Sequence, residues 1–137
     1  MIFSAGFSKT AFADEADKTT LVYGSTDYTR INPAMDEHCE INVLLFDGLT
    51  DHDGDNQIIP RLAKSWEYDE ENLTYTFHLE EGVKWHDGEP FTAEDVKFTF
   101  EAIMDPANES ENAPDYEDIE SIEVIDEHTV AFHLSNV

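Results

Sequence analysis

Short runs of β-branched and aromatic residues recur along the chain and predict strands. These runs are residues 19–24, 49–50, 58–59, 66–68, 73–79, 119–125 and 129–134. The last six runs form three pairs, and the two members of each pair are joined by a short polar segment, residues 53–56, 69–72 or 126–128. The first two of these segments are rich in the turn formers Asp and Asn. The pattern therefore predicts three hairpins, and Pro60 prevents a long continuation of the first one. Further turns are expected at the glycines of residues 81–82 and 86–88.

One segment carries the start signal of a helix. Thr92 and Asp95 have the spacing of a capping box, in which each residue satisfies a backbone amide at the helix start. The apolar residues that follow are Val96, Phe98, Phe100 and Ile103. We therefore expect a helix over residues 93–104 that Pro106 ends, followed by an acidic loop over residues 108–118.

A second helix is predicted nearer the N-terminus. From about residue 37, apolar residues recur at helical spacing, and Gly48 stands where a C-terminal cap belongs. These residues are Ile41, Leu44, Leu45 and Phe46. The spacing predicts about three helical turns. Upstream, Pro33 excludes Asn32 from the α conformation, so residues 31–33 predict a loop.

The charge balance limits the partners of the chain. It has 32 acidic and 7 basic residues, for a formal charge of −25. Nucleic acid and anionic membrane surfaces are poor partners for such a chain because they require clustered Lys and Arg. The hydrophobic fraction of 40% and aromatic fraction of 12% are too high for a disordered acidic tail, so the chain is expected to fold. One explanation of the excess acid is a salt-adapted source, which predicts stability that rises with salt.

The first residues resemble an export signal. Residues 2–13 are mostly apolar or small and end in Ala11-Phe12-Ala13, the A-x-A pattern of a cleavage site. No basic segment precedes them and Lys9 interrupts the apolar run, so a signal-peptide remnant and a disordered tail are both open. No run approaches the ~20 apolar residues that span a bilayer.

Three carboxylates at alternate positions, Asp51, Asp53 and Asp55, match the opening of a calcium-binding loop. The match then fails, because Asn56 replaces the required glycine and Leu62 replaces the bidentate glutamate. A solvated hairpin turn is favoured, and a secreted, calcium-dependent acidic module remains as an alternative.

The other chemistry-bearing residues do not form a known catalytic pattern. The six histidines include no HExxH or similar zinc spacing, and His78 and His133 are expected on strand faces. His38, Cys39 and Glu40 are three adjacent potential metal ligands, but adjacent residues rarely converge on one ion. No nucleophile elbow, phosphate-binding loop or glycine fingerprint is present. We expect no enzyme, no cofactor and no metal centre.

Three ordered motifs carry a family resemblance. Residues 60–67 are PRLAKSWE, residues 73–79 are LTYTFHL, and residues 82–96 are GVKWHDGEPFTAEDV. They resemble the family-5 extracytoplasmic solute-binding proteins, the peptide and nickel receptors of ABC importers. The resemblance extends from about residue 21 to residue 137, and the third motif is specific enough to carry it alone.

The resemblance implies a non-catalytic, two-lobed, periplasmic-binding-protein-like receptor of the α+β class. Residues 1–13 would be the signal remnant, 14–49 the start of the first lobe with its cleft loop and helix, and 50–137 a small α+β subdomain. The rest of both lobes, with the main ligand-selecting residues, would follow Val137. We expect an exported, periplasmic or extracellular monomer that carries an oligopeptide or dipeptide, or alternatively a nickel or metal chelate, to a membrane permease. Asp14 follows the cleavage pattern where a lipoprotein has cysteine, so no lipid anchor is expected.

The same resemblance assigns ligand contact to one short segment. The residues are Met35, Asp36, Glu37, His38, Cys39 and Glu40. A loop held at a helix start offers backbone donors and acceptors to an extended peptide. Nickel-binding members have a sulfur-bearing side chain near the position of Cys39, whereas the simpler interpretation of Cys39 is a small packed side chain.

The motifs that identify the family are expected to be structural. Their glycines and Pro90 set turns, and Thr92 caps a helix. Trp66, Trp85 and Phe91 are expected to fill a core.

Overall fold

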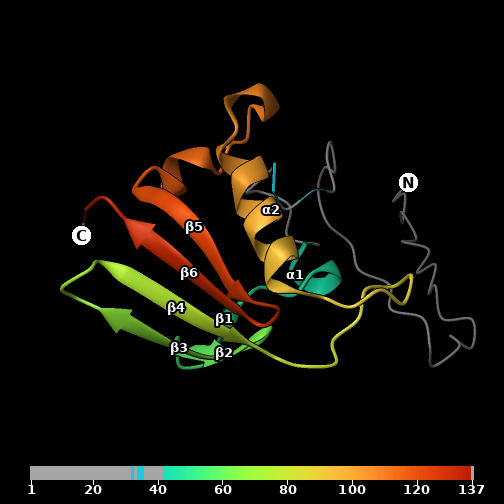
Figure 1. The fold of residues 1–137 in the computed structure, drawn as a ribbon. Coiled ribbons are helices and arrows are strands. Elements are labelled where there is room, and N and C mark those ends of the chain that lie inside the picture. The colour runs from blue at the N-terminus through green and yellow to red at the C-terminus, as the bar shows by residue number, and fades with distance from the viewer. Residues whose placement is uncertain (1–31, 33, 36–41, 137) are drawn as a thin grey trace, which may run out of the picture.

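The computed structural model describes residues 32, 34–35 and 42–136. They form a four-stranded antiparallel sheet with one helix across a face, a short hairpin and a short N-terminal helix (Figure 1). The elements are α1 (Asn42–Leu45), β1 (Thr50–His52), β2 (Ile58–Pro60), β3 (Ala63–Asp69), β4 (Thr74–Leu79), α2 (Ala93–Met104), the 3₁₀ turns η1 (Pro106–Asn108) and η2 (Ala113–Tyr116), β5 (Ile119–Asp126) and β6 (Thr129–Leu134). The strand prediction for residues 19–24 and the signal prediction for residues 1–13 lie outside the described residues. Within them, no helix is long and apolar enough to cross a membrane.

The three predicted hairpins are confirmed, and an aspartate begins the turn of each. Asp53 Oδ1 accepts hydrogen bonds from the amides of Asp55 and Gln57, each at 2.9 Å. Asp69 Oδ1 accepts from the amide of Glu71 at 2.9 Å, and Asp126 Oδ1 from that of His128 at 2.8 Å. These side chains replace backbone hydrogen bonds at points where the chain reverses, which explains why Asp recurs there.

The sheet has the strand order β3-β4-β6-β5 and two chemically different faces. On one face, Phe77, Val130 and Val124 are cross-strand neighbours, as are Tyr75, Phe132 and Ile122. On the other face, Glu67, Thr76, Ala131 and Glu123 form such a row. The polar face is open to water, and α2 packs on the apolar face over β5 and β6 (Figure 1).

The core lies between α2 and the apolar face. Its buried members are Ala63, Leu79, Phe91, Ala93, Val96, Ile122, Val130 and Phe132. Phe132 is at its centre, because its ring meets Phe77 edge-on at 5.5 Å and Phe100 at 4.9 Å between centroids. Helix α2 packs over β5 and β6, and the aromatic rings nearer β3 remain partly exposed. Among them, the rings of Tyr68 and Tyr75 stack with 4.4 Å between their centroids.

Helix α2 has the predicted boundaries and the predicted capping box. The Asp95 carboxylate accepts from the Thr92 amide at 2.8 Å and from the Thr92 hydroxyl at 3.1 Å. One of the apolar residues named for this helix, Phe98, does not join the core, because it is 73% exposed. Because Phe98 is two residues from both Val96 and Phe100, it lies on the opposite side of a helix whose turn is 3.6 residues.

Three sequence predictions need correction. Helix α1 ends at Leu45 rather than at Gly48, and Gly48 instead lies where an added Cβ would be 2.9 Å from the Thr50 carbonyl oxygen. Trp85 is 45% exposed and only meets the buried Phe91 edge-on at 5.8 Å, so it does not fill the core. The acidic loop over residues 108–118 contains η2 and the end of η1. The predicted start of the first helix, residues 37–41, lies outside the described residues.

Candidate functional site

Met35, the first residue of the predicted ligand segment, lies in a tight turn with Ala34 that Asn32 closes. Asn32 Oδ1 accepts from the Ala34 amide at 3.0 Å, and the Asn32 carbonyl oxygen accepts from the Met35 amide at 3.0 Å. Of the loop predicted over residues 31–33, the structure describes Asn32, and the other two residues lie outside the described part of the chain. Met35 is half-buried, and it is the one predicted site residue that the structure describes. The others, Asp36, Glu37, His38, Cys39 and Glu40, lie outside the described residues.

Two hydrogen bonds fasten this turn to a distant loop between η1 and η2. The Ser110 hydroxyl donates to the Ala34 carbonyl oxygen at 2.5 Å, and the Glu111 amide donates to the Met35 carbonyl oxygen at 3.3 Å. The two segments are separated by 76 residues. No sequence signal predicted this contact, because a serine in an acidic loop has no periodicity or motif that indicates a distant partner.

Two carboxylates of the acidic cluster at residues 51–55, those of Asp51 and Asp53, accept hydrogen bonds from the protein itself. The Arg61 guanidinium donates from Nε to Asp51 Oδ2 at 3.0 Å, and the His52 amide donates to Asp51 Oδ1 at 2.8 Å. The backbone hydrogen bond from His52, followed by the one from Arg61, lowers the pKa of Asp51 below its ordinary 3.8. Within the described part of the chain, no group of three or more His, Cys, Asp or Glu side chains is arranged to hold a metal ion. The arrangement stabilises a hairpin, which gives the calcium alternative no support from geometry.

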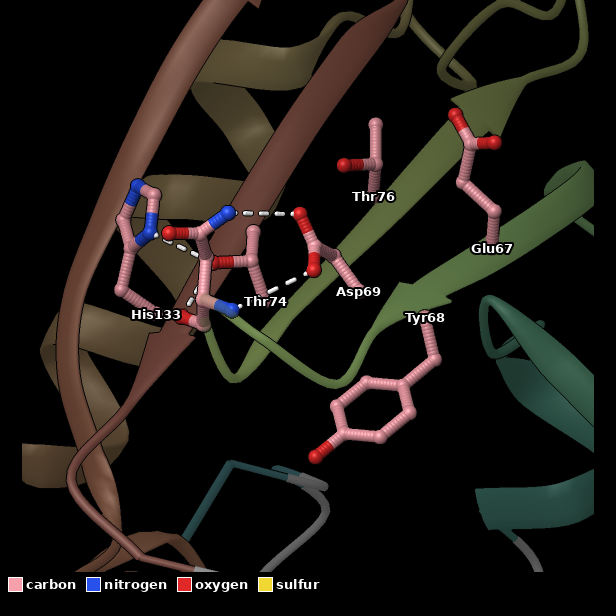
Figure 2. A pocket seen from close by; sticks show the side chains of 7 residues that line it. Glu67, Tyr68, Asp69, Thr74, Thr76 and His133 are labelled. Carbon is pink, nitrogen blue, oxygen red and sulfur yellow. Dashed lines mark hydrogen bonds between the residues drawn. The ribbon is translucent and has the colours of Figure 1, made fainter.

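A polar hollow of about 490 Å³ lies on the outer face of the sheet near the β3–β4 turn (Figure 2). Asp69 Oδ2 accepts from the side-chain amide of Asn72 at 2.7 Å, and the Thr74 hydroxyl is 3.0 Å from His133 Nδ1. The hydrogen bond from the Asn72 side chain is the largest cause that lowers the pKa of Asp69. These groups bond to one another around an open surface, and no predicted site residue lines it. The hydrogen bonds around the β3–β4 turn therefore account for the shape of this hollow.

The two strand histidines have the predicted positions on this outer face. His133 Nε2 is 3.3 Å from Glu123 Oε2, and His78 Nε2 is 3.5 Å from Glu67 Oε1. Each is a cross-strand pair at the surface, an arrangement that contributes little to stability.

A second hollow, of about 350 Å³, is apolar and opens on the helix side of the sheet. Tyr75, Phe77, Phe100 and Tyr116 are among its lining residues. Burial raises the pKa of the Tyr116 phenol, whose ring meets Phe100 edge-on at 5.1 Å. Tyr116 thereby fastens η2, and with it the loop that holds the ligand segment, to the core.

Comparison with known proteins assigns the chain to a family. The model of the family "Bacterial extracellular solute-binding proteins, family 5 Middle" matches residues 57–137, which is more than half of the chain. The chain belongs to this family. The match includes the four-stranded sheet, α2 and the loop of Ser110, and it confirms the resemblance that the three motifs carried.

Individual members of the family resemble the chain over a larger part of its length. Di/tripeptide-binding protein 1 of Pseudomonas aeruginosa is 38% identical over 111 residues, which cover 68% of this chain and 21% of that protein. Among solved structures, Campylobacter jejuni NikZ in complex with Ni(L-His) has a TM-score of 0.75 at 40% identity, covering 79% of this chain and 22% of that chain. Haemophilus influenzae OppA in complex with the peptide RPPGFSPFR has a TM-score of 0.69 at 29% identity, covering 77% and 25%.

These coverages show that the chain spans about a fifth to a quarter of the length of such relatives. The described α+β fold thus corresponds to one part of a periplasmic-binding-protein-like structure, as the fold prediction stated.

Proposed function

We propose that this chain is part of an exported receptor that binds oligopeptides or dipeptides and delivers them to a membrane-embedded ABC permease, without catalysis. Membership of a solute-binding family carries the proposal. The name of the Pseudomonas relative and the peptide in the OppA structure favour a peptide as the solute. In this division of the chain, residues 14–49 supply a wall of the cleft and residues 50–137 form the small subdomain that supports it.

The candidate ligand contacts are the backbone and side chains of residues 35–40. The turn at Asn32 places Met35 beside the loop of Ser110, which supports a fixed starting position for the segment. A segment that is already held in one position loses less conformational entropy when a peptide binds. Backbone donors and acceptors pair with a peptide main chain whatever its side chains are, so one receptor accepts many sequences.

A chelated metal is the second candidate solute. The likeness to NikZ with Ni(L-His), at a TM-score of 0.75, favours it, and His38 and Cys39 are side chains that nickel accepts. The two candidates differ in what they require of this segment, because a peptide would use its backbone and a metal chelate would use these side chains.

Thermal unfolding of the full-length gene product tests both candidates. A ligand at 100 times its Kd stabilises the folded state by about 2.7 kcal/mol, so a true solute raises Tm visibly. Dipeptides and oligopeptides are expected to raise it, and Cys39→Ser is expected to leave their effect unchanged. A rise with nickel–histidine alone, lost in Cys39→Ser, would support the chelate instead. No rise with either class would contradict the proposed function.

A further inference from the structure

Two asparagines of the chain stand in the Asn-X-Ser/Thr triplet that N-glycosylating enzymes modify. The triplets are residues 72–74, Asn-Leu-Thr, and residues 108–110, Asn-Glu-Ser. Such a triplet is an acceptor where it lies on the surface of a secreted protein. We propose that Asn72 is a glycosylation site whose sugar comes from a lipid-linked oligosaccharide. The inference rests on the proposed function for export and not for the identity of the solute.

Asn72 has the surface position that this modification requires. It is exposed and lies in the turn between Asp69, the last residue of β3, and Thr74, the first residue of β4 (Figure 2). The polar hollow of about 490 Å³ opens beside it, on the face of the sheet that α2 does not cover. A bulky group on Asn72 would therefore extend into solvent and would displace no core side chain.

The Asn72 side chain can carry a sugar and keep its own hydrogen bond. An asparagine amide has two N–H groups. One of them donates to Asp69 Oδ2 at 2.7 Å, and within the described residues the second has no acceptor. Attachment of a sugar replaces one hydrogen of Nδ2, so the other stays available to Asp69. The turn that Asp69 holds, through the backbone amides of Glu71 and Asn72 as well, is therefore compatible with the modification.

The transfer is a substitution at the anomeric carbon of the donor sugar. The bond between that carbon and a phosphate oxygen of the lipid-linked donor breaks, and a bond between the carbon and Asn72 Nδ2 forms. The lipid phosphate leaves with the electron pair of the broken bond, and Nδ2 gives up one proton. Nothing is oxidised or reduced, so the donor is the one co-reactant.

The second triplet is held by contacts between separate segments. The Asn108 side-chain amide donates to the Ala102 carbonyl oxygen in the last turn of α2 at 2.8 Å. The Ser110 hydroxyl donates to the Ala34 carbonyl oxygen, 76 residues away in the sequence. An enzyme that reaches this amide and this hydroxyl must displace both contacts.

The first triplet is attached more locally. The partner of the Asn72 side chain, Asp69, is three residues away in the same turn. The Thr74 hydroxyl donates to the Asn72 carbonyl oxygen at 2.9 Å and lies 3.0 Å from His133 Nδ1, at the open end of the sheet. Opening of one hairpin end thus presents Asn72, and this local opening requires less free energy than separation of distant segments.

Mass spectrometry of the full-length gene product, isolated from its native host and digested with trypsin, tests the proposal. Cleavage after Lys64 and Lys84 releases residues 65–84, in which Asn72 is the only asparagine. We expect this peptide to be heavier by whole sugar residues, which fragmentation places on Asn72. The tryptic peptide that begins at residue 98, which contains Asn108, is expected to have its unmodified mass.

Substitutions within the triplet separate its role from that of the turn. Thr74→Ala keeps Asn72 and destroys the triplet, so the mass increase should be lost completely. Thr74→Ser keeps the triplet and should keep the increase. Asn56→Gln is the matched control, because Asn56 is an exposed asparagine between β1 and β2 that has Ile58 two residues later, and residues 65–84 should remain modified.

The wild-type mass decides the proposal even where a variant fails to fold. Unmodified residues 65–84, a sugar on Asn108 instead, or an increase that persists in Thr74→Ala would each overturn the assignment to Asn72. If Asn72 is modified but the protein binds neither peptides nor nickel–histidine, the site stands and the proposed function fails. If the protein binds peptide and residues 65–84 are unmodified, the proposed function stands and the site fails.

Discussion

The capping box of α2 offers a quantitative test of how this fold is held together, by the substitution Asp95→Ala. The Asp95 carboxylate accepts hydrogen bonds from the Thr92 amide at 2.8 Å and the Thr92 hydroxyl at 3.1 Å. It also places a negative charge in the first turn of the helix, where the helix dipole favours one by about 0.3–1 kcal/mol. Losing a cap costs ~1 kcal/mol by itself. We therefore expect Asp95→Ala to lower the free energy of unfolding by roughly 1–2 kcal/mol.

Glu94→Ala is the control for charge. Glu94 lies in the same first turn and is exposed, and within the described residues its side chain forms no hydrogen bond. Both substitutions remove one negative charge from a strongly acidic protein and from the same end of the helix. Only Asp95→Ala also removes the capping box. The difference between the two variants should be about 1 kcal/mol.

Urea denaturation is the suitable assay, because guanidinium is a salt that would screen the charges under study. The midpoint of Asp95→Ala should fall with an unchanged m-value, whereas that of Glu94→Ala should fall less, by no more than the helix-dipole contribution of about 0.3–1 kcal/mol. Equal midpoints for the two variants would refute the reasoning, since the cost would then come from charge and not from the hydrogen-bonded box.

Three further measurements address the core, the surface charge and the turns. Phe132→Ala should cost about 3–5 kcal/mol because Phe132 is 4% exposed, while Phe98→Ala, at 73% exposed, should cost less than ~0.5 kcal/mol; equal midpoints in urea would contradict the described core. Addition of 2 M NaCl should raise Tm because salt screens the repulsion within a chain of charge −25, and a flat response would remove the salt-adaptation explanation. The pKa of Asp69 is lowered from 3.8, so its carboxylate stabilises the fold above that pH and the contribution is lost as the pH falls through the lowered value. In urea titrations the advantage of wild type over Asp69→Asn should therefore shrink as the pH falls below the ordinary 3.8 of an aspartate, and a constant difference would contradict this linkage.

The elements predicted correctly from sequence are those whose cause is local. The α2 boundaries follow from Thr92 and Asp95, which signal a helix start through residues only three apart, and from Pro106, which cannot continue the helix. The hairpins follow from aspartates that bond to amides two to four residues away, as Asp53 does.

Burial of individual aromatic side chains could not be predicted, because it depends on packing between distant segments. The apolar residues after the capping box indicate a helix without indicating which of them face the core, and the helical rotation turns Phe98 to water. Trp85 belongs to a motif of the family, and membership of a motif does not imply burial.

The candidate site was predictable only in its first part. Asn32 and Met35 are described and form a turn, whereas the ligand role of Met35 and of residues 36–40 stays a prediction. Its attachment to Ser110 was not predictable, because the two segments are separated by 76 residues and no local pattern links them.

Whether the full-length gene product is a peptide receptor is decided by equilibrium binding of peptides to it. Isothermal titration with a set of dipeptides and oligopeptides of varied sequence, and with nickel–histidine in parallel, gives both Kd and stoichiometry. We expect one peptide bound per protein chain, with affinities that vary little with peptide side chains because backbone groups make the contact. If no peptide releases or absorbs heat on addition and none reaches saturation, the chain is not part of a peptide receptor. Saturation by nickel–histidine alone would identify the solute as the chelate.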